Sequence, residues 1–111
     1  MNDTVRLGLI LKKIVILLNK GQYTVALDHL KEVESMLNLL LKNKRVLLYM
    51  EEEYKLLTFY YQLYLDLLSE YYYLIKSYGE STKCILEMFR YGGIYNISSR
   101  IKAFNRLINI I

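Results

Sequence analysis

From Val46 to Tyr78 the sequence contains no glycine and no proline, and residues that favour helices fill the stretch. At 1.5 Å per residue, one helix over this stretch would be about 50 Å long. The rest of the chain also lacks proline, and leucine, isoleucine, glutamate and lysine are abundant in it. We therefore predict an all-α fold, and a length of 111 residues indicates one domain.

Helix-stop and cap residues divide the chain further. Gly21, Asn43, Gly79 and the pair Gly92-Gly93 each favour a break between helices. The predicted helices cover residues 4–20, 22–42, 46–78, 82–91 and 97–110. The first two form an antiparallel hairpin joined at Gly21, and the third is a long central helix. We thus predict a single helical-bundle domain over residues 1–111, with about five helices.

Apolar side chains recur at helical spacing. The helix at 4–20 is apolar on most sides, which is typical of a helix buried between several neighbours. Two other helices carry one apolar stripe each, with steps of four and three residues that are typical of paired helices. At 22–42 the stripe is Ala26, Leu30, Val33, Leu37 and Leu40, and at 97–110 it is Ile97, Ile101, Phe104, Ile108 and Ile111.

Most of the 12 tyrosines lie in the predicted central helix, whose polar side chains (among them Gln62, Asp66 and Ser69) form only a narrow stripe. A compact domain of this size is roughly 35 Å across, so a helix of about 50 Å would protrude and expose apolar side chains. We therefore expect a homodimer that pairs along this helix. The candidate interface residues are Tyr54, Tyr61, Tyr64, Tyr71, Tyr72, Tyr73 and Tyr78. Alternatively, these tyrosines surround the core with their hydroxyls in water.

Positive charge gathers at the C-terminal end of the sequence. After Glu87 there is no acidic residue, and Arg90, Arg100, Lys102 and Arg106 equal the whole net charge of +4. Such a segment can contact phosphates, an anionic membrane or an acidic partner. The candidate nucleic-acid or anion-binding residues are Lys42, Lys44, Arg45, Arg90, Arg100, Lys102 and Arg106. The alternative is a bundle helix with a solvated outer face.

Residues that carry chemistry are scarce. The single histidine, His29, excludes a histidine pair for a metal, and the single cysteine, Cys84, excludes an internal disulfide. Three consecutive carboxylates, Glu51 to Glu53, point in different directions on a helix and suit its N-terminal dipole. We expect no catalytic, metal or cofactor-binding residues. The first hypothesis is a non-enzymatic interaction module, and the second is a nucleic-acid-binding subunit or packaging protein of a nucleoprotein complex.

The sequence also bears on location. Its longest apolar run, from Ile14 to Leu18, is far shorter than the roughly 18 residues that span a membrane. With one cysteine and no membrane span, we expect a cytoplasmic protein. The tyrosine- and isoleucine-rich, proline-free composition resembles that of small proteins from hyperthermophilic archaea and their viruses. That resemblance implies a location inside a cell, which for a virus is the infected host.

The segment from Gly21 to Leu27 resembles the G-x-Y-x-x-A-L turn of tetratricopeptide repeats and of microtubule-interacting and trafficking domains. It is also similar to the start of the second helix in HEPN proteins. Each resemblance implies a helix hairpin with a close contact at Ala26. The HEPN nuclease site pairs an arginine with a histidine on a late helix, whereas His29 is early in this sequence. The resemblance therefore implies no nuclease activity.

Overall fold

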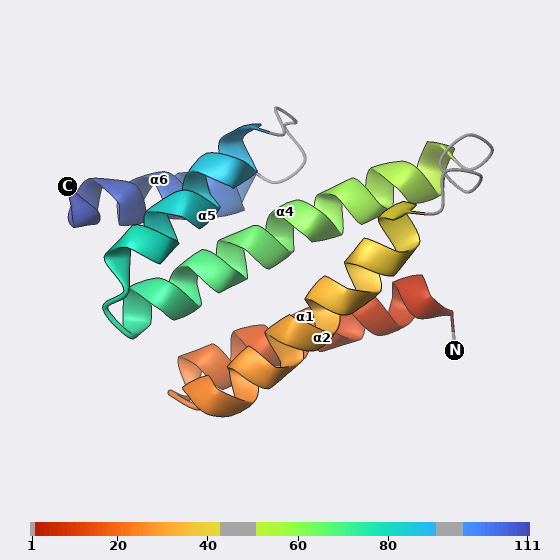
Figure 1. Cartoon of the computed structure of the whole chain (residues 1–111), viewed down its shortest axis with the longest axis horizontal. Helices are drawn as coiled ribbons and strands as arrows, with labels where there is room; N and C mark the ends of the chain where they lie inside the picture. Colours follow the sequence, from red (N-terminus) through yellow and green to blue (C-terminus); the bar gives the residue numbers. More distant parts are fainter. Residues whose placement is uncertain (1, 43–50, 91–96) are drawn as a thin grey trace.

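The computed structural model describes residues 2–42, 51–90 and 97–111, with the backbone alone for residues 51–54. These residues form five α-helices, labelled as in Figure 1: α1 (Asp3–Asn19), α2 (Tyr23–Lys42), α4 (Glu51–Leu74), α5 (Tyr78–Arg90) and α6 (Ile97–Ile110). No strand occurs in the described part of the chain. The predicted all-α helical bundle is therefore confirmed.

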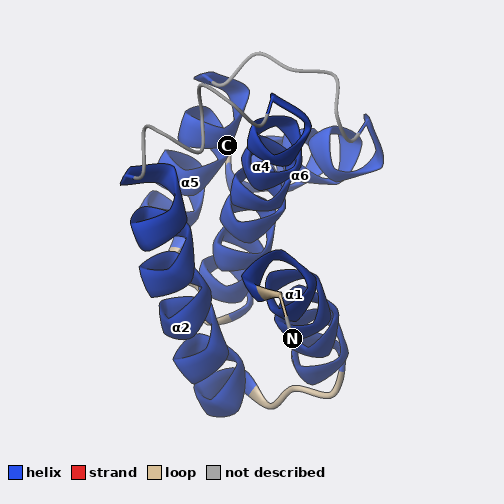
Figure 2. Ribbon diagram, turned by 90° about the vertical axis from the view of Figure 1, so that its right-hand side faces the viewer, coloured by secondary structure: helices blue, strands red, loops and turns tan. Residues whose placement is uncertain are grey.

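The N-terminal hairpin forms as predicted. Asn2 caps α1, because its Oδ1 accepts a hydrogen bond from the Thr4 N–H at 2.8 Å. At the other end of α1, Gly21 adopts a left-handed φ of 74°. The N–H groups of Gly21 and Gln22 donate to carbonyls three and five residues earlier, at 3.1 and 2.9 Å. This is the Schellman arrangement, and it returns the chain so that α2 packs beside α1 (Figure 2).

The central helix is shorter than predicted at its C-terminal end. α4 stops at Leu74 and α5 begins at Tyr78, so the predicted boundaries at residues 78 and 82 are wrong. Lys76 has a φ of 65°, and the N–H groups of Lys76 and Ser77 donate to carbonyls three and five residues earlier. A lysine thus occupies the Schellman position where glycine is usual. The predicted start at residue 46 and the end at residue 91 lie outside the described residues.

α4 lies at the centre of the bundle. α1 and α2 pack against one part of it and α5 and α6 against another, and among the described helices these two pairs make no backbone contact with each other (Figures 1 and 2). The 24 residues of α4 span about 36 Å, which fits within the longest molecular extent of 42 Å. Over its described residues α4 therefore does not protrude, which removes the reason for pairing along this helix. The predicted part before Glu51 lies outside the described residues.

Apolar residues of both hairpin helices form the hydrophobic core, including most of the predicted stripe of α2. The buried side chains there are Leu7, Leu11, Ile14 and Leu18 of α1 and Ala26, Leu30, Val33 and Leu37 of α2. The second half of the core includes Leu67 of α4 and Ile85 and Met88 of α5. In contrast, Leu9, Val15 and Ile16 of α1 are between 40% and 52% exposed. The prediction that α1 is buried on most sides is therefore wrong.

Candidate interaction surface on α6

The structure places most of the candidate interface tyrosines against the protein itself. Tyr64 and Tyr71 are buried, so the prediction that they contact a partner is wrong. The Tyr64 hydroxyl donates a 2.8 Å hydrogen bond to Glu34 of α2, and burial together with this bond raises the pKa of Tyr64. Of the others, Tyr61, Tyr72 and Tyr73 are half-buried and Tyr78 is exposed, while the side chain of Tyr54 lies outside the described residues.

The candidate basic residues do not form one patch. Arg90 pairs with Glu87 at 3.5 Å, and the Arg100 guanidinium lies 5.4 Å from the centre of the Phe89 ring. Lys42, at the end of α2, and Lys102 are exposed. Because α2 makes no backbone contact with α6, Lys42 belongs to a different part of the surface. Lys44 and Arg45 lie outside the described residues.

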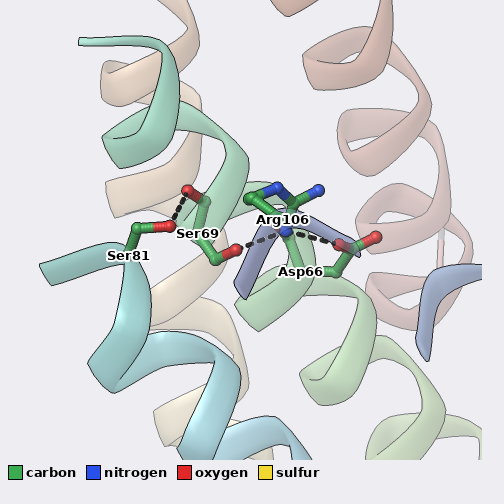
Figure 3. Close-up of polar contacts among 4 residues, drawn as sticks. All are labelled: Asp66, Ser69, Ser81 and Arg106. Carbon is green, nitrogen blue, oxygen red and sulfur yellow. Dashed lines mark hydrogen bonds and ion pairs between the residues drawn. The ribbon is translucent and has the colours of Figure 1, made fainter. Parts of the chain in front are cut away.

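Arg106 is buried, so the prediction that it contacts a phosphate at the surface is wrong. One nitrogen of its guanidinium, Nη1, lies 3.2 Å from Oδ1 of Asp66 and also donates to the Ser69 hydroxyl (Figure 3). The Ser81 hydroxyl of α5 donates to the Ser69 carbonyl at 2.8 Å, so three helices meet here. We call Asp66, Ser69, Ser81 and Arg106 the polar network, in which each residue is at most 8% exposed.

Burial sets the charge balance of the polar network. The pKa of Asp66 is raised, because loss of solvent outweighs the lowering effects of Arg106, Ser99 and Lys102. Beside it on α4, Gln62 is 3% exposed, and its Nε2 finds no hydrogen-bond partner among the described residues. Part of the polar stripe of α4 is therefore not at the surface, although its member Lys55 is exposed. Its members Gln62, Asp66 and Ser69 lie inside the bundle.

α6 thus packs with the polar residues Ser99 and Arg106 inward, beside Ala103 and the partly buried Leu107 and Ile110. Its buried residues are Ser99, Ala103 and Arg106, whereas its apolar stripe faces outward. We call this stripe the α6 ridge: Ile97, Ile101, Phe104, Ile108 and Ile111. The first four members are between 54% and 58% exposed, and Ile111 is 94% exposed. A hollow of about 370 Å³ beside the ridge is lined by Phe89, Ile97, Arg100, Ile101 and Phe104.

α1 also shows an apolar surface to solvent. Its residues Val5, Leu9 and Val15 line a hollow of about 520 Å³ against Phe59, Tyr60 and Leu63 of α4. Lys12 lines the same hollow and interrupts the row of apolar side chains along α1. The α6 ridge has no such interruption, and it is therefore the more continuous apolar surface of the two.

Sequence periodicity identified the ridge residues but not the direction in which they point. A repeat of apolar residues shows that they share a helix face, and an inward direction is only the usual outcome. The sequence does contain polar residues that indicate the inward packing of Arg106, and they lie on two different helices. Asp66 and Ser69 share one face of α4, while Ser99 and Arg106, seven residues apart, share the face of α6 opposite the ridge.

The described residues also show no candidate metal site. They contain no group of three or more histidine, cysteine, aspartate or glutamate side chains placed to hold a metal ion. Cys84 is buried, and burial raises its pKa to about 11. None of the helices in the described part is long and apolar enough to cross a membrane. Comparisons with protein-family models, with curated proteins and with solved structures found no match to this chain.

Proposed function

We propose that this protein is a non-enzymatic α-helical interaction module that assembles as a homodimer through the α6 ridge. The observation that carries the proposal is the reversed packing of α6, with Arg106 buried and Ile101 and Phe104 more than half exposed. An apolar patch of several hundred Å² on a small soluble protein commonly marks an interaction site. The ridge replaces the tyrosine-rich helix as the proposed surface, because Tyr64 and Tyr71 of that helix are buried within one chain.

The spacing of the ridge suits a helix as its partner. Its residues step by four and three along α6, which is the seam of a two-helix coiled coil. An isolated pair of 14-residue helices would be only marginally stable in water. Here α6 is already held on the bundle, so pairing does not have to pay for helix formation.

The charges beside the ridge allow a second copy of the chain to pack against it. In an antiparallel pair, Ile101 would lie beside Phe104 of the partner subunit, and Arg100 would lie beside Leu107 of the partner subunit. The other flank of the ridge carries the uncharged Ser98 and Asn105. No two like charges are then opposed along the seam, and a two-fold axis makes the surface complementary to itself.

The nucleic-acid hypothesis gains no support from the contacts at the C-terminal end. Phosphate binding requires accessible cations, and Arg106 is 8% exposed and paired with Asp66. The outward side of α6 carries the apolar ridge and the single exposed cation Lys102. The intracellular location and the archaeal or viral source stay predictions from composition.

Light scattering tests the proposal. At tens of micromolar, the wild-type protein should have twice the 13.3 kDa mass of one chain. The variant Ile101→Gln/Phe104→Gln should be a monomer with unchanged helix content, since glutamine favours helices and removes apolar area.

The matched control is Leu9→Gln/Ile16→Gln, which changes two α1 side chains of similar exposure, 51% and 52%. This control should remain a dimer. A wild-type monomer, or a dimer that both variants weaken equally, would show that the ridge is not the assembly surface.

A further inference from the structure

An amphipathic helix normally packs its apolar side inward, so the reversed packing of α6 needs a cause. The inward side of α6 meets a face of α4 that is itself polar, with Gln62, Asp66 and Ser69 all at most 5% exposed. Arg106 is the one described cation paired with the Asp66 carboxylate, at 3.2 Å. Its hydrogen bonds to Asp66 and Ser69 come from the single nitrogen Nη1.

The alternative packing can be compared directly. Turning α6 by half a turn would place the α6 ridge against α4 and move Arg106 into solvent. The ridge would then gain from burial, whereas Ala103, Leu107 and Ile110 would lose their contacts with the core. The Asp66 carboxylate would lie among apolar side chains without Arg106. Removing one partner of a buried ion pair is strongly destabilising, because an uncompensated charge is left inside. The outward ridge and the buried pair therefore depend on each other.

We infer that Arg106 is a positioning residue: its contacts with Asp66 and Ser69 select the orientation of α6 and so present the α6 ridge to a partner. The statement that this orientation serves a partner rests on the proposed function. The orientation of α6 itself can be measured separately. Ser81 supports the arrangement from α5, because it donates to the Ser69 carbonyl at 2.8 Å.

The ion pair between Asp66 and Arg106 adds less to stability than its short distance would suggest. The raised pKa of Asp66 shows that burial disfavours its charged form in spite of the arginine. Replacing a buried ion pair by apolar side chains is often neutral or stabilising in other proteins. The role left for the pair is to choose between two packings, as a single buried polar residue chooses the register of a coiled coil.

The decisive variant is Asp66→Leu/Arg106→Met, which removes both charges and keeps the side-chain volumes similar. It should fold, with a melting temperature equal to or above that of the wild type, and α6 should turn its ridge inward. Two cysteine probes report the orientation in a Cys84→Ser background. Ile108→Cys probes the outward side, since Ile108 is 55% exposed, and Ser99→Cys probes the inward side, since Ser99 is 8% exposed.

In the parent protein the thiol at position 108 should react with a maleimide faster than the thiol at position 99. In the Asp66→Leu/Arg106→Met variant that order should reverse, with each rate changing about tenfold or more as the thiol moves between buried and exposed positions. Arg106→Lys should keep the parent order, because one ammonium group can replace the contacts of Nη1. The reactions are run at a concentration where light scattering shows monomers, so failure of dimerisation alone leaves this result unaffected.

Three outcomes would overturn the inference. Thiol rates in the Asp66→Leu/Arg106→Met variant equal to those of the parent would show that the polar network does not set the orientation. Loss of helix content in the same variant would show that the network is needed for folding itself. Reversal of the order in Arg106→Lys would also contradict a role for the cation.

Discussion

Asp66 illustrates how a buried carboxylate changes stability with pH. Its surroundings are the Arg106 and Lys102 cations and Ser99 of α6, and Ser69 of its own helix. Burial nevertheless raises the pKa of Asp66 above its ordinary value of 3.8. Between that value and the raised pKa, the folded protein holds a proton that the unfolded chain has released. The free energy of unfolding contributed by Asp66 must therefore fall as pH rises through this window.

Asp66→Asn provides the test, because asparagine does not titrate. Subtracting its unfolding free energy from that of the wild type at each pH removes the effect of the other carboxylates. Measured by urea denaturation from about pH 3.5 to pH 7, this difference should decrease as pH rises and then become constant. A difference that increases with pH would mean that Arg106 lowers the pKa of Asp66 below 3.8.

Arg106 also shows that the sequence alone does not predict which basic side chain is buried. Four basic residues after the last acidic residue predict a cationic segment, and Arg90 and Lys102 do lie at the surface. Which of the four is buried depends on the position of Asp66, 40 residues earlier in the chain. A count of charges along the sequence does not show that Arg106 and Asp66 come together in the fold.

Two helices end in the same way but with different residues. α1 ends at Gly21 with a φ of 74°, and α4 ends at Lys76 with a φ of 65°. Glycine adopts this conformation without cost, whereas for a residue with a side chain it costs about 1–2 kcal/mol of conformational energy. The structure therefore holds a small strain at Lys76, whose side chain is exposed.

Lys76→Gly should raise the free energy of unfolding by about 0.5–1 kcal/mol, because relief of the strain exceeds the added freedom of the unfolded chain. The reciprocal control, Gly21→Lys, should lower the free energy of unfolding by about 1 kcal/mol. A Cβ added at Gly21 would meet no atom within 4 Å, so the cost there comes from φ alone. Chemical denaturation measures both, and destabilisation by Lys76→Gly would contradict this account.

The sequence predicted the first of these helix ends and misplaced the second. Gly21 follows an apolar helix pattern directly, and its position is confirmed. After α4 the nearest glycine is Gly79, which instead lies in the first turn of α5. Residue preferences are statistical, and the packing of α5 against α4 decides where the turn occurs. The five helices of the described residues were therefore predictable, but this boundary was not.

The bundle as a unit divides into two groups of helices that share α4. α1, α2 and α4 enclose an apolar core, with Leu7, Ile14 and Val33 completely buried. α4, α5 and α6 enclose the polar network in addition to apolar side chains such as Ile85. The second group gains less from apolar burial, so we expect it to open more readily than the first.

Native-state hydrogen exchange can measure this difference. Amides in the middle of α6 should be at least about tenfold less protected than those in the middle of α1 and α2. The monomeric variant Ile101→Gln/Phe104→Gln is the appropriate sample, because a dimer would itself protect α6. Equal protection in all the described helices would show that the bundle opens only as one unit.

The sharing of α4 has a consequence for how such a chain can be altered. Among the described helices the backbones of the hairpin and of the α5–α6 pair each contact α4 but not each other, so we expect surface changes on one side to disturb the packing of the other little. The C-terminal pair can be redesigned to display a different outward surface, provided that Asp66 and Ser69 keep a suitable contact. Descendants of this protein could thus diversify in what they bind while their N-terminal hairpin stays the same.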